Sequence, residues 1–285
     1  MLIENKQGNY TFSCNTEFDI LKRVIVCPPA YMTIKKVINE TQKHFLDHNI
    51  DRVKAMEQHN TFMEVLKTHG AEIIQFPPLE TFPEQVFTRD IGFTIGDTVF
   101  VSTMGNDIRR GEESLLLSWL QGAGEFAKKI ESHSIEGGDV VIDQSTVWVG
   151  VSKRTTEAAI KELQGKLPQH EVIAVPFDSK YLHLDCLFNV ISPTDALIYI
   201  PAFSKESRDL FGSRYSLIEV NEKEQFTMGP NVLSIGNGKI ISLPENQQLN
   251  EKLRHTGYEV IEVDISEIIK SGGSFRCCTL PINRA

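Results

Sequence analysis

The amino-acid sequence predicts an α/β fold in which five ββαβ modules surround a common centre, within one domain spanning residues 1–285. Three observations support this prediction. Candidate hairpins recur at a regular interval, amphipathic helical patterns lie between them, and the chain leaves several of these helices through strands of similar sequence. We found no proline-rich, low-complexity or strongly charged stretch that would link separate domains.

The candidate hairpins combine β-branched residues with turn-forming residues at their middle. They span residues 93–101, 140–151, 187–200 and 232–243. The anchors of their turns, Gly96, Gln144, Thr194 and Asn237, are separated by 48, 50 and 43 residues. Unrelated segments would rarely recur at such an interval, so we interpret the hairpins as repeated modules.

Helical patterns between the hairpins place apolar residues on one helix face. The residues that carry them are Val53, Met56, Met63 and Leu66; Ile160, Leu163 and Leu167; and Leu249 and Leu253. Each pattern then runs into a predicted strand, in HGAEIIQFP (69–77), QHEVIAVPF (169–177) and TGYEVIEVD (256–264). Gly70 and Gly257 fit the position after a helix that favours left-handed backbone.

The first module has a predicted strand at Leu21 to Cys27 and a helix at Ile50 to Thr68, but no adjacent hairpin partner. We expect the partner strand to come from the C-terminal segment Cys278 to Ile282, which would close a ring of modules. The segment Pro28 to Asn49 lacks clear periodicity. We interpret it as a mobile loop that covers a site.

Charge and cysteine content exclude several classes of protein. The net charge is −9 and the basic residues are scattered, so we expect no nucleic-acid partner. The sequence shows neither a signal peptide nor a run of about 20 apolar residues, which predicts a soluble cytoplasmic protein without membrane contact. Five cysteines without CxxC or Cys/His ligand spacing predict no disulfide framework, no metal site and no cofactor. Homo-oligomer formation is left open.

Ionisable residues sit at the edges of predicted apolar strands in four segments. These are FTRD (87–90), IEGGD (135–139), HLDC (183–186) and GGSFRCCT (272–279). In a ring of repeats, equivalent strand ends converge on one place, so the four segments predict a shared site there.

These segments resemble the signatures of the guanidino-group-modifying superfamily, the penteins, which includes arginine deiminase, dimethylarginine dimethylaminohydrolase and glycine amidinotransferase. The resemblance covers nearly the whole chain, because LKRVIVCPP (21–29) is similar to the family's first strand and GGSFRCCT to its last. It implies a five-fold pseudosymmetric α/β propeller, in agreement with the repeat, and a small-molecule guanidino substrate.

The resemblance implies that Cys277 is the nucleophile that attacks the guanidinium carbon. Cys277-Cys278-Thr279 matches the family's Cys-x-Thr pattern, and Arg276 stands where several relatives have His. Such a thiol must react as thiolate, with a cation or backbone donors nearby. Taken alone, two adjacent cysteines are more often small buried hydrophobes. Cys278 is then interpreted as a neighbouring strand residue pointing the other way.

His183 is the candidate general acid and base, because one imidazole can protonate the leaving amine and later deprotonate water. Glu136 is similar to the family glutamate that hydrogen-bonds this histidine. Asp90 and Asp185 are candidate clamps for the planar guanidinium. A carboxylate at the position of Asp185 is usual in arginine deiminase and amidinotransferase but not in dimethylarginine dimethylaminohydrolase.

Further candidates surround this group. Asp139 is interpreted as a substrate-site residue or as a cap of the Gly137-Gly138 turn. Arg109, Arg110 and Arg154 resemble the family's arginines for the substrate carboxylate, although all three also fit helix starts. The remaining histidines are interpreted as solvent-facing: His44, His48, His59, His69, His133, His170 and His255.

The resemblance implies hydrolysis of a C–N bond in a guanidino compound through a covalent Cys-thiouronium intermediate. Compact length favours a dimethylarginine dimethylaminohydrolase-like enzyme, whereas Asp185 favours arginine deiminase-like hydrolysis. Amidino transfer through the same intermediate is also open. A non-catalytic binding protein of this fold, like a ribosomal anti-association factor, should lack the Cys, His and paired Asp.

Overall fold

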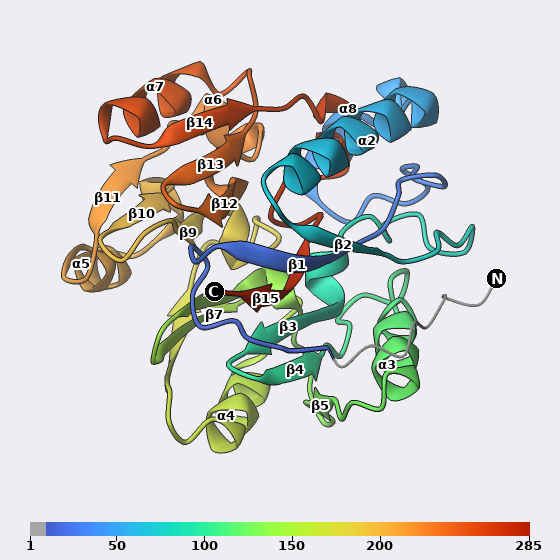
Figure 1. The fold of residues 1–285 in the computed structure, drawn as a ribbon. Helices are drawn as coiled ribbons and strands as arrows, with labels where there is room; N and C mark the ends of the chain where they lie inside the picture. The colour runs from blue at the N-terminus through green and yellow to red at the C-terminus, as the bar shows by residue number, and fades with distance from the viewer. Residues whose placement is uncertain (1–9) are drawn as a thin grey trace.

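The structure is a computed structural model that describes residues 10–285, and within them it contains five three-stranded sheets. In every sheet the middle strand pairs antiparallel with one neighbour and parallel with the other. The sheets surround a common middle, and the longer helices α2, α3, α4, α5 and α7 lie on the outside (Figure 1). The predicted α/β fold of five modules is therefore confirmed.

The strands are β1 (Leu21–Val26), β2 (Glu72–Gln75), β3 (Gly92–Ile95), β4 (Thr98–Val101), β5 (Lys128–Lys129), β6 (Val140–Asp143), β7 (Thr146–Val151), β8 (Glu171–Pro176), β9 (Phe188–Val190), β10 (Asp195–Ile198), β11 (Ser216–Glu219), β12 (Leu233–Gly236), β13 (Lys239–Ser242), β14 (Glu259–Glu262) and β15 (Leu280–Arg284). The helices are α1 (Glu40–His44), α2 (Arg52–Thr68), α3 (Glu113–Gly122), α4 (Glu157–Lys166), α5 (Lys205–Gly212), α6 (Glu222–Phe226), α7 (Gln247–His255) and α8 (Ser266–Ile269).

All four predicted hairpins form, as β3-β4, β6-β7, β9-β10 and β12-β13. The turn residues explain why. Gly96, Gln144 and Asn237 adopt positive φ angles of 58°, 54° and 54°, which are the angles that tight hairpin turns require. Gly70 and Gly257, at φ of 88° and 102°, end α2 and α7 as predicted.

The first module closes through the two ends of the described chain, as predicted. β1 pairs antiparallel with β15, with Val24 opposite Pro281 and Ile25 opposite Leu280, and it pairs in parallel with β2. The C-terminus therefore lies in the same sheet as the first strand (Figure 1). This pairing brings the segment 272–279, just before β15, into the middle of the molecule.

Helix α2 corrects two expectations. Val53 is 70% exposed, so the buried face of α2 consists of other residues: Ala55, Gln58, His59, Phe62, Met63 and Leu66. His59 was expected to face solvent and is buried instead. Burial lowers its pKa to about 4, because a charged imidazole would lose its hydration there.

No helix in the described part of the chain is both long and apolar enough to cross a membrane.

Four short 3₁₀ turns position the polar motifs. They comprise Thr88–Ile91, Gly137–Asp139, Leu184–Cys186 and Gly229–Asn231, and each lies just before the first strand of a hairpin. Consecutive turns contact one another in the order given. The inner ends of four modules therefore meet at one place.

Candidate active site

Each turn contributes one of four buried polar side chains to this region: Asp90, Asp139, Asp185 and Asn231. Asn231 was not anticipated from the sequence. Its segment, GPN, occupies the place that TRD, GGD and LDC have in the other modules, so aligning the repeats would have revealed it. Cys277 reaches the same region from the segment before β15.

His183 lies between two carboxylates. Its Nε2 is 2.8 Å from Glu136 Oε2, and its Nδ1 is 3.5 Å from Asp90 Oδ1. Burial alone would lower the pKa of this histidine, but the negative charges of Asp90, Asp139 and Glu136 outweigh it and raise the pKa to about 10. His183 is therefore an imidazolium at neutral pH.

Glu136 is held as a carboxylate. Burial would raise its pKa, but the hydrogen bond to His183 and the charges of His183 and Arg154 lower it to about 2. Its second oxygen accepts a hydrogen bond from the Gly105 amide at 2.9 Å and lies 3.4 Å from Arg154 Nη1. Three groups, His183, the Gly105 amide and Arg154, thus fix the carboxylate that orients the imidazole.

The Cys277 thiol lies against Asp185, with Sγ 3.6 Å from Oδ2 and 3.9 Å from Oδ1. Its backbone amide donates to Asn231 Oδ1 at 3.1 Å, and its carbonyl accepts from the Arg89 amide at 3.0 Å. Asn231 also donates to the Asp185 carbonyl at 3.2 Å. Asn231 therefore fixes the thiol-bearing segment relative to the turn of Asp185.

Arg276 pairs with Asp185 Oδ2 at 2.6 Å, the same oxygen that lies 3.6 Å from the Cys277 sulfur. It also contacts Glu17 at 2.9 Å and the Val140 carbonyl at 2.6 Å. Glu17 was not anticipated either, and its partner Arg276 lies 259 residues away in sequence. Arg276 donates a hydrogen bond to Asp185 Oδ2. The other carboxylate oxygen, Asp185 Oδ1, has only the sulfur atoms of Cys186 and Cys277 as hydrogen-bond partners.

The three candidate arginines lie in different surroundings. Arg109 is buried and pairs with Asp90 and Glu112, and it donates to the carbonyls of Glu84 and Phe87. These contacts leave it little capacity for a substrate carboxylate. Arg110 is exposed and pairs with Asp107 at 2.8 Å, outside the cluster.

Arg154 contacts Glu136 and also lines a cavity. The cavity is about 540 Å³ in volume and is also lined by the basic residues Lys36, Lys153 and Lys180. The cavity lining therefore carries four cationic side chains and two carboxylates, those of Glu40 and Asp178. This excess of positive charge favours binding of an anionic group.

Asp139 does not cap the turn of its own module, contrary to one of the two interpretations. Its side chain accepts hydrogen bonds from Ser152 Oγ at 2.6 Å and from the Leu184 amide at 2.9 Å. Burial raises its pKa to about 6. Asp139 therefore joins its module to the turn that follows His183.

The group Asp90, Glu136 and His183 offers three ligand atoms within 4.8 Å of one another. Metal binding would require a neutral imidazole. The ion pairs of His183 with both carboxylates favour the protonated form, so this set fits a proton-transfer site better than a metal site.

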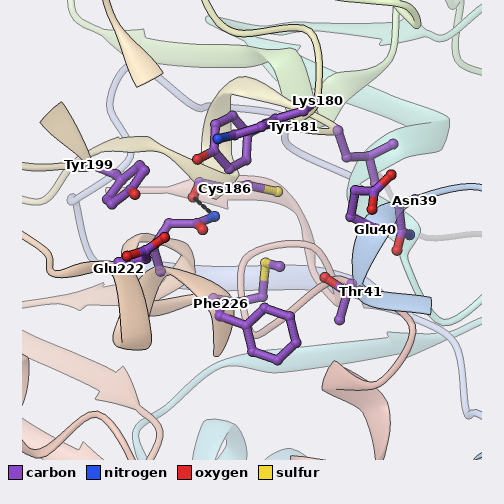
Figure 2. A pocket seen from close by; sticks show the side chains of 13 residues that line it. Asn39, Glu40, Thr41, Lys180, Tyr181, Cys186, Tyr199, Glu222 and Phe226 are labelled. Carbon is purple, nitrogen blue, oxygen red and sulfur yellow. Dashed lines mark hydrogen bonds between the residues drawn. The ribbon is translucent and has the colours of Figure 1, made fainter. Parts of the chain in front are cut away.

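The centre of the cluster is closed to solvent, since His183, Glu136 and Asp185 are wholly buried and Cys277 is 3% exposed. A cavity of about 220 Å³ adjoins it, with Cys186 in its wall. Asn39, Glu40 and Thr41 lie on one side of this cavity, opposite Tyr199 and Glu222 (Figure 2). Part of the segment predicted as a covering loop therefore lies beside the site, but it contains α1 rather than irregular chain.

Buried hydrogen bonds hold this covering segment, residues 36–42, in place. Gln42 Nε2 donates to Glu84 Oε1 and Ser271 Oγ, both at 2.8 Å, and Asn39 Nδ2 donates to the Ser271 carbonyl at 2.9 Å. Gln42 is wholly buried. The segment is thus attached to the residues just before GGSFRCCT.

Replacing Gln42 with alanine should loosen the covering segment. The variant leaves the Glu84 carboxylate without one buried donor, which should lower the free energy of unfolding by about 1–3 kcal/mol. Amide hydrogen exchange should become faster in residues 36–45. Lys43→Ala, on the exposed side of α1, is the matched control and should change neither quantity; equal exchange in both variants would contradict the attachment.

Comparisons with known proteins show which family this chain resembles over most of its length. The family described as "N,N dimethylarginine dimethylhydrolase, eukaryotic" matches residues 28–284. The Bacillus subtilis protein YkgA is 51% identical over 95% of both chains. The N(G),N(G)-dimethylarginine dimethylaminohydrolase of Mycobacterium tuberculosis is 27% identical, over 92% of this chain and 86% of its own. The N-terminal domain of ArgZ, a cyanobacterial arginine dihydrolase, superposes with a TM-score of 0.84 at 26% identity, over 92% of this chain and 98% of its own.

Proposed function

The chain belongs to the N,N-dimethylarginine dimethylhydrolase family of guanidino-modifying enzymes, and we propose that it hydrolyses a C–N bond of a small guanidino compound with Cys277 as nucleophile. The observation that carries the proposal is the contact of the Cys277 thiol with Asp185, in a buried cluster that also holds the His183 imidazolium. A guanidinium bound here would meet carboxylates around its plane and a sulfur at its carbon.

The proposed reaction has two halves. The positive charge of the bound guanidinium favours loss of the Cys277 thiol proton to solvent, and the resulting thiolate attacks the guanidinium carbon. His183 donates its proton to the departing amine as the C–N bond breaks. The product of this half is an S-alkylthiouronium on Cys277. His183, now neutral, takes a proton from water, which attacks the same carbon and releases a ureido product and the thiolate. One residue thus acts first as acid and then as base.

Binding of the guanidinium is assigned to Asp185, Asp90 and Glu136. Asp185 Oδ1 is directed at the thiol region, and Asp90 Oδ1 has no hydrogen-bond partner while buried. These are the acceptors that guanidinium N–H groups would satisfy. Because the centre is buried, entry requires the covering segment to move.

Arg154 is the proposed partner of a substrate carboxylate, because Arg154 lines the basic cavity whereas Arg109 is bound to Asp90 and Glu112. Arg154→Ala should raise KM for arginine-type substrates by about 10- to 100-fold, the range expected for a lost charge-assisted hydrogen bond. Agmatine, which lacks the carboxylate, should show no such increase in KM. Steady-state kinetics with both compounds measures the difference.

Arg110→Ala is the matched control for Arg154→Ala, because Arg110 is an exposed arginine in an ion pair with Asp107. It should leave KM unchanged for both compounds. A larger effect of Arg110→Ala, or equal losses of Arg154→Ala on arginine and agmatine, would remove Arg154 from the carboxylate site.

The second candidate is hydrolysis of unsubstituted arginine, which the similarity to the arginine dihydrolase ArgZ favours. A substrate panel distinguishes the two: arginine, methylated arginines, agmatine and guanidino acids, with ureido and amine products followed by mass. Release of methylamines identifies a dimethylarginine-type enzyme, and release of ammonia an arginine-type enzyme. Turnover only in the presence of an amine acceptor would indicate amidino transfer, and no turnover at all would leave a binding protein.

A further inference from the structure

Cys186 is a second buried thiol at the site, and the proposed reaction does not use it. Its Sγ lies 3.6 Å from Asp185 Oδ1, the same oxygen that lies 3.9 Å from Cys277 Sγ. One carboxylate oxygen of Asp185 therefore contacts both sulfurs. Cys186 and Cys277 are 91 residues apart in sequence, but their sulfur atoms lie against the same oxygen of Asp185.

Cys186 also lines the cavity of about 220 Å³ that lies beside the covering segment. Figure 2 shows its sulfur between Tyr181 and the residues of that segment, within the cavity wall. Cys186, Cys277 and Cys278 all belong to the main apolar core, but of the three only Cys186 lines this cavity. A small oxidant in the cavity would therefore meet Cys186 first and then Cys277, which lies against the same oxygen of Asp185.

We propose that Cys186 and Cys277 form a peroxide-sensitive pair that closes to a reversible disulfide. A peroxide such as H₂O₂ oxidises the Cys277 thiol to a sulfenic acid and is reduced to water. The Cys186 thiol then attacks the sulfenic sulfur, the S–O bond breaks, and a second water leaves as the S–S bond forms. A dithiol reductant restores both thiols.

Proximity is what makes Cys186 suited to the second step. The neighbouring Cys277 thiol, and then burial, raise the pKa of the Cys186 thiol, so it carries little thiolate at neutral pH. A partner held against the same carboxylate oxygen compensates, since the attack is intramolecular. The cross-link would occupy the nucleophile and also protect it from oxidation beyond the sulfenic acid.

The test uses the full-length reduced protein without substrate, treated with H₂O₂ at about two molar equivalents or more, because a sulfinic acid consumes two peroxides, then alkylated and mapped by peptide mass. Wild type should lose about 2 Da, yield a peptide pair joined through Cys186 and Cys277, and return to the reduced mass with dithiothreitol. Cys186→Ala should instead accumulate irreversible Cys277 sulfinic acid, a gain of about 32 Da. Cys278→Ala, the matched control, should still form the cross-link.

Two results would overturn the proposal: sulfinic Cys277 beside free Cys186 in the wild type, or a cross-link of Cys277 to Cys278. Thermal unfolding of each variant before oxidation verifies that it is folded. Because the readout is mass in the absence of substrate, the outcome does not depend on whether the protein turns over a guanidino compound.

Discussion

Replacing Cys277 with alanine should lower kcat for the best guanidino substrate by about 10⁴-fold or more, since loss of a covalent nucleophile removes the reaction path itself. The variant should keep its fold, because the Cys277 backbone, rather than its thiol, carries the hydrogen bonds to Asn231 and Arg89. Steady-state rates with the substrate identified in the panel measure the effect. Substrate binding should survive, since the carboxylates remain.

Cys278→Ala provides the matched control for this prediction. The same chemical change one residue away removes a thiol from the apolar core, at 0% exposure. It should cost some stability through the cavity it leaves but keep kcat within about tenfold of wild type. If Cys278→Ala abolished turnover and Cys277→Ala did not, the nucleophile assignment would be reversed.

Replacing His183 with glutamine should lower kcat by about 10²- to 10⁴-fold, the range for loss of a general acid and base. The pH dependence follows from the raised pKa. Its folded-state pKa of about 10 lies above the usual histidine value, so the proton is present throughout the neutral range and is lost as pH rises through about 10. The stability that the imidazolium contributes is likewise full below the unfolded pKa, about 6.5, and lost toward pH 10.

Glu136→Gln tests the origin of that shift. Removing this negative charge should lower the pKa of His183, so the alkaline fall of kcat should move to lower pH. NMR titration of the imidazole should show the same displacement without substrate. An unchanged titration in Glu136→Gln would show that the contact at 2.8 Å does not set the protonation state.

The sequence was informative about the fold where local patterns decide the structure. The hairpins were predictable because β-branched runs and positive-φ turn residues act locally, and the pairing of β1 with β15 was predicted because β1 has no adjacent hairpin partner. Elements without such patterns were missed. Strand β5 has only two residues, β11 has exposed ends, and α3 carries apolar residues on several sides, so none has a distinct period.

The sequence predicted which motifs form the site, but it did not predict which side chains pair with one another there. Family resemblance and strand-end position together indicated His183, Cys277 and their carboxylates. The partners of those carboxylates depend on which distant side chains meet across modules, as Arg276 meets Glu17 and Asp185, and no local pattern specifies such pairs. This is also why Arg109 looked like a substrate-binding residue although it is bound to Asp90 and Glu112.

The covalent intermediate offers the most direct measurement. The protein is mixed with its best substrate, quenched in acid within milliseconds to seconds, and digested for peptide mass analysis. We expect a transient adduct on the peptide that contains Cys277, with the mass of the substrate minus the departing amine, and its decay should match formation of the ureido product. Turnover without any adduct on Cys277, or an adduct on a different residue, would contradict the account.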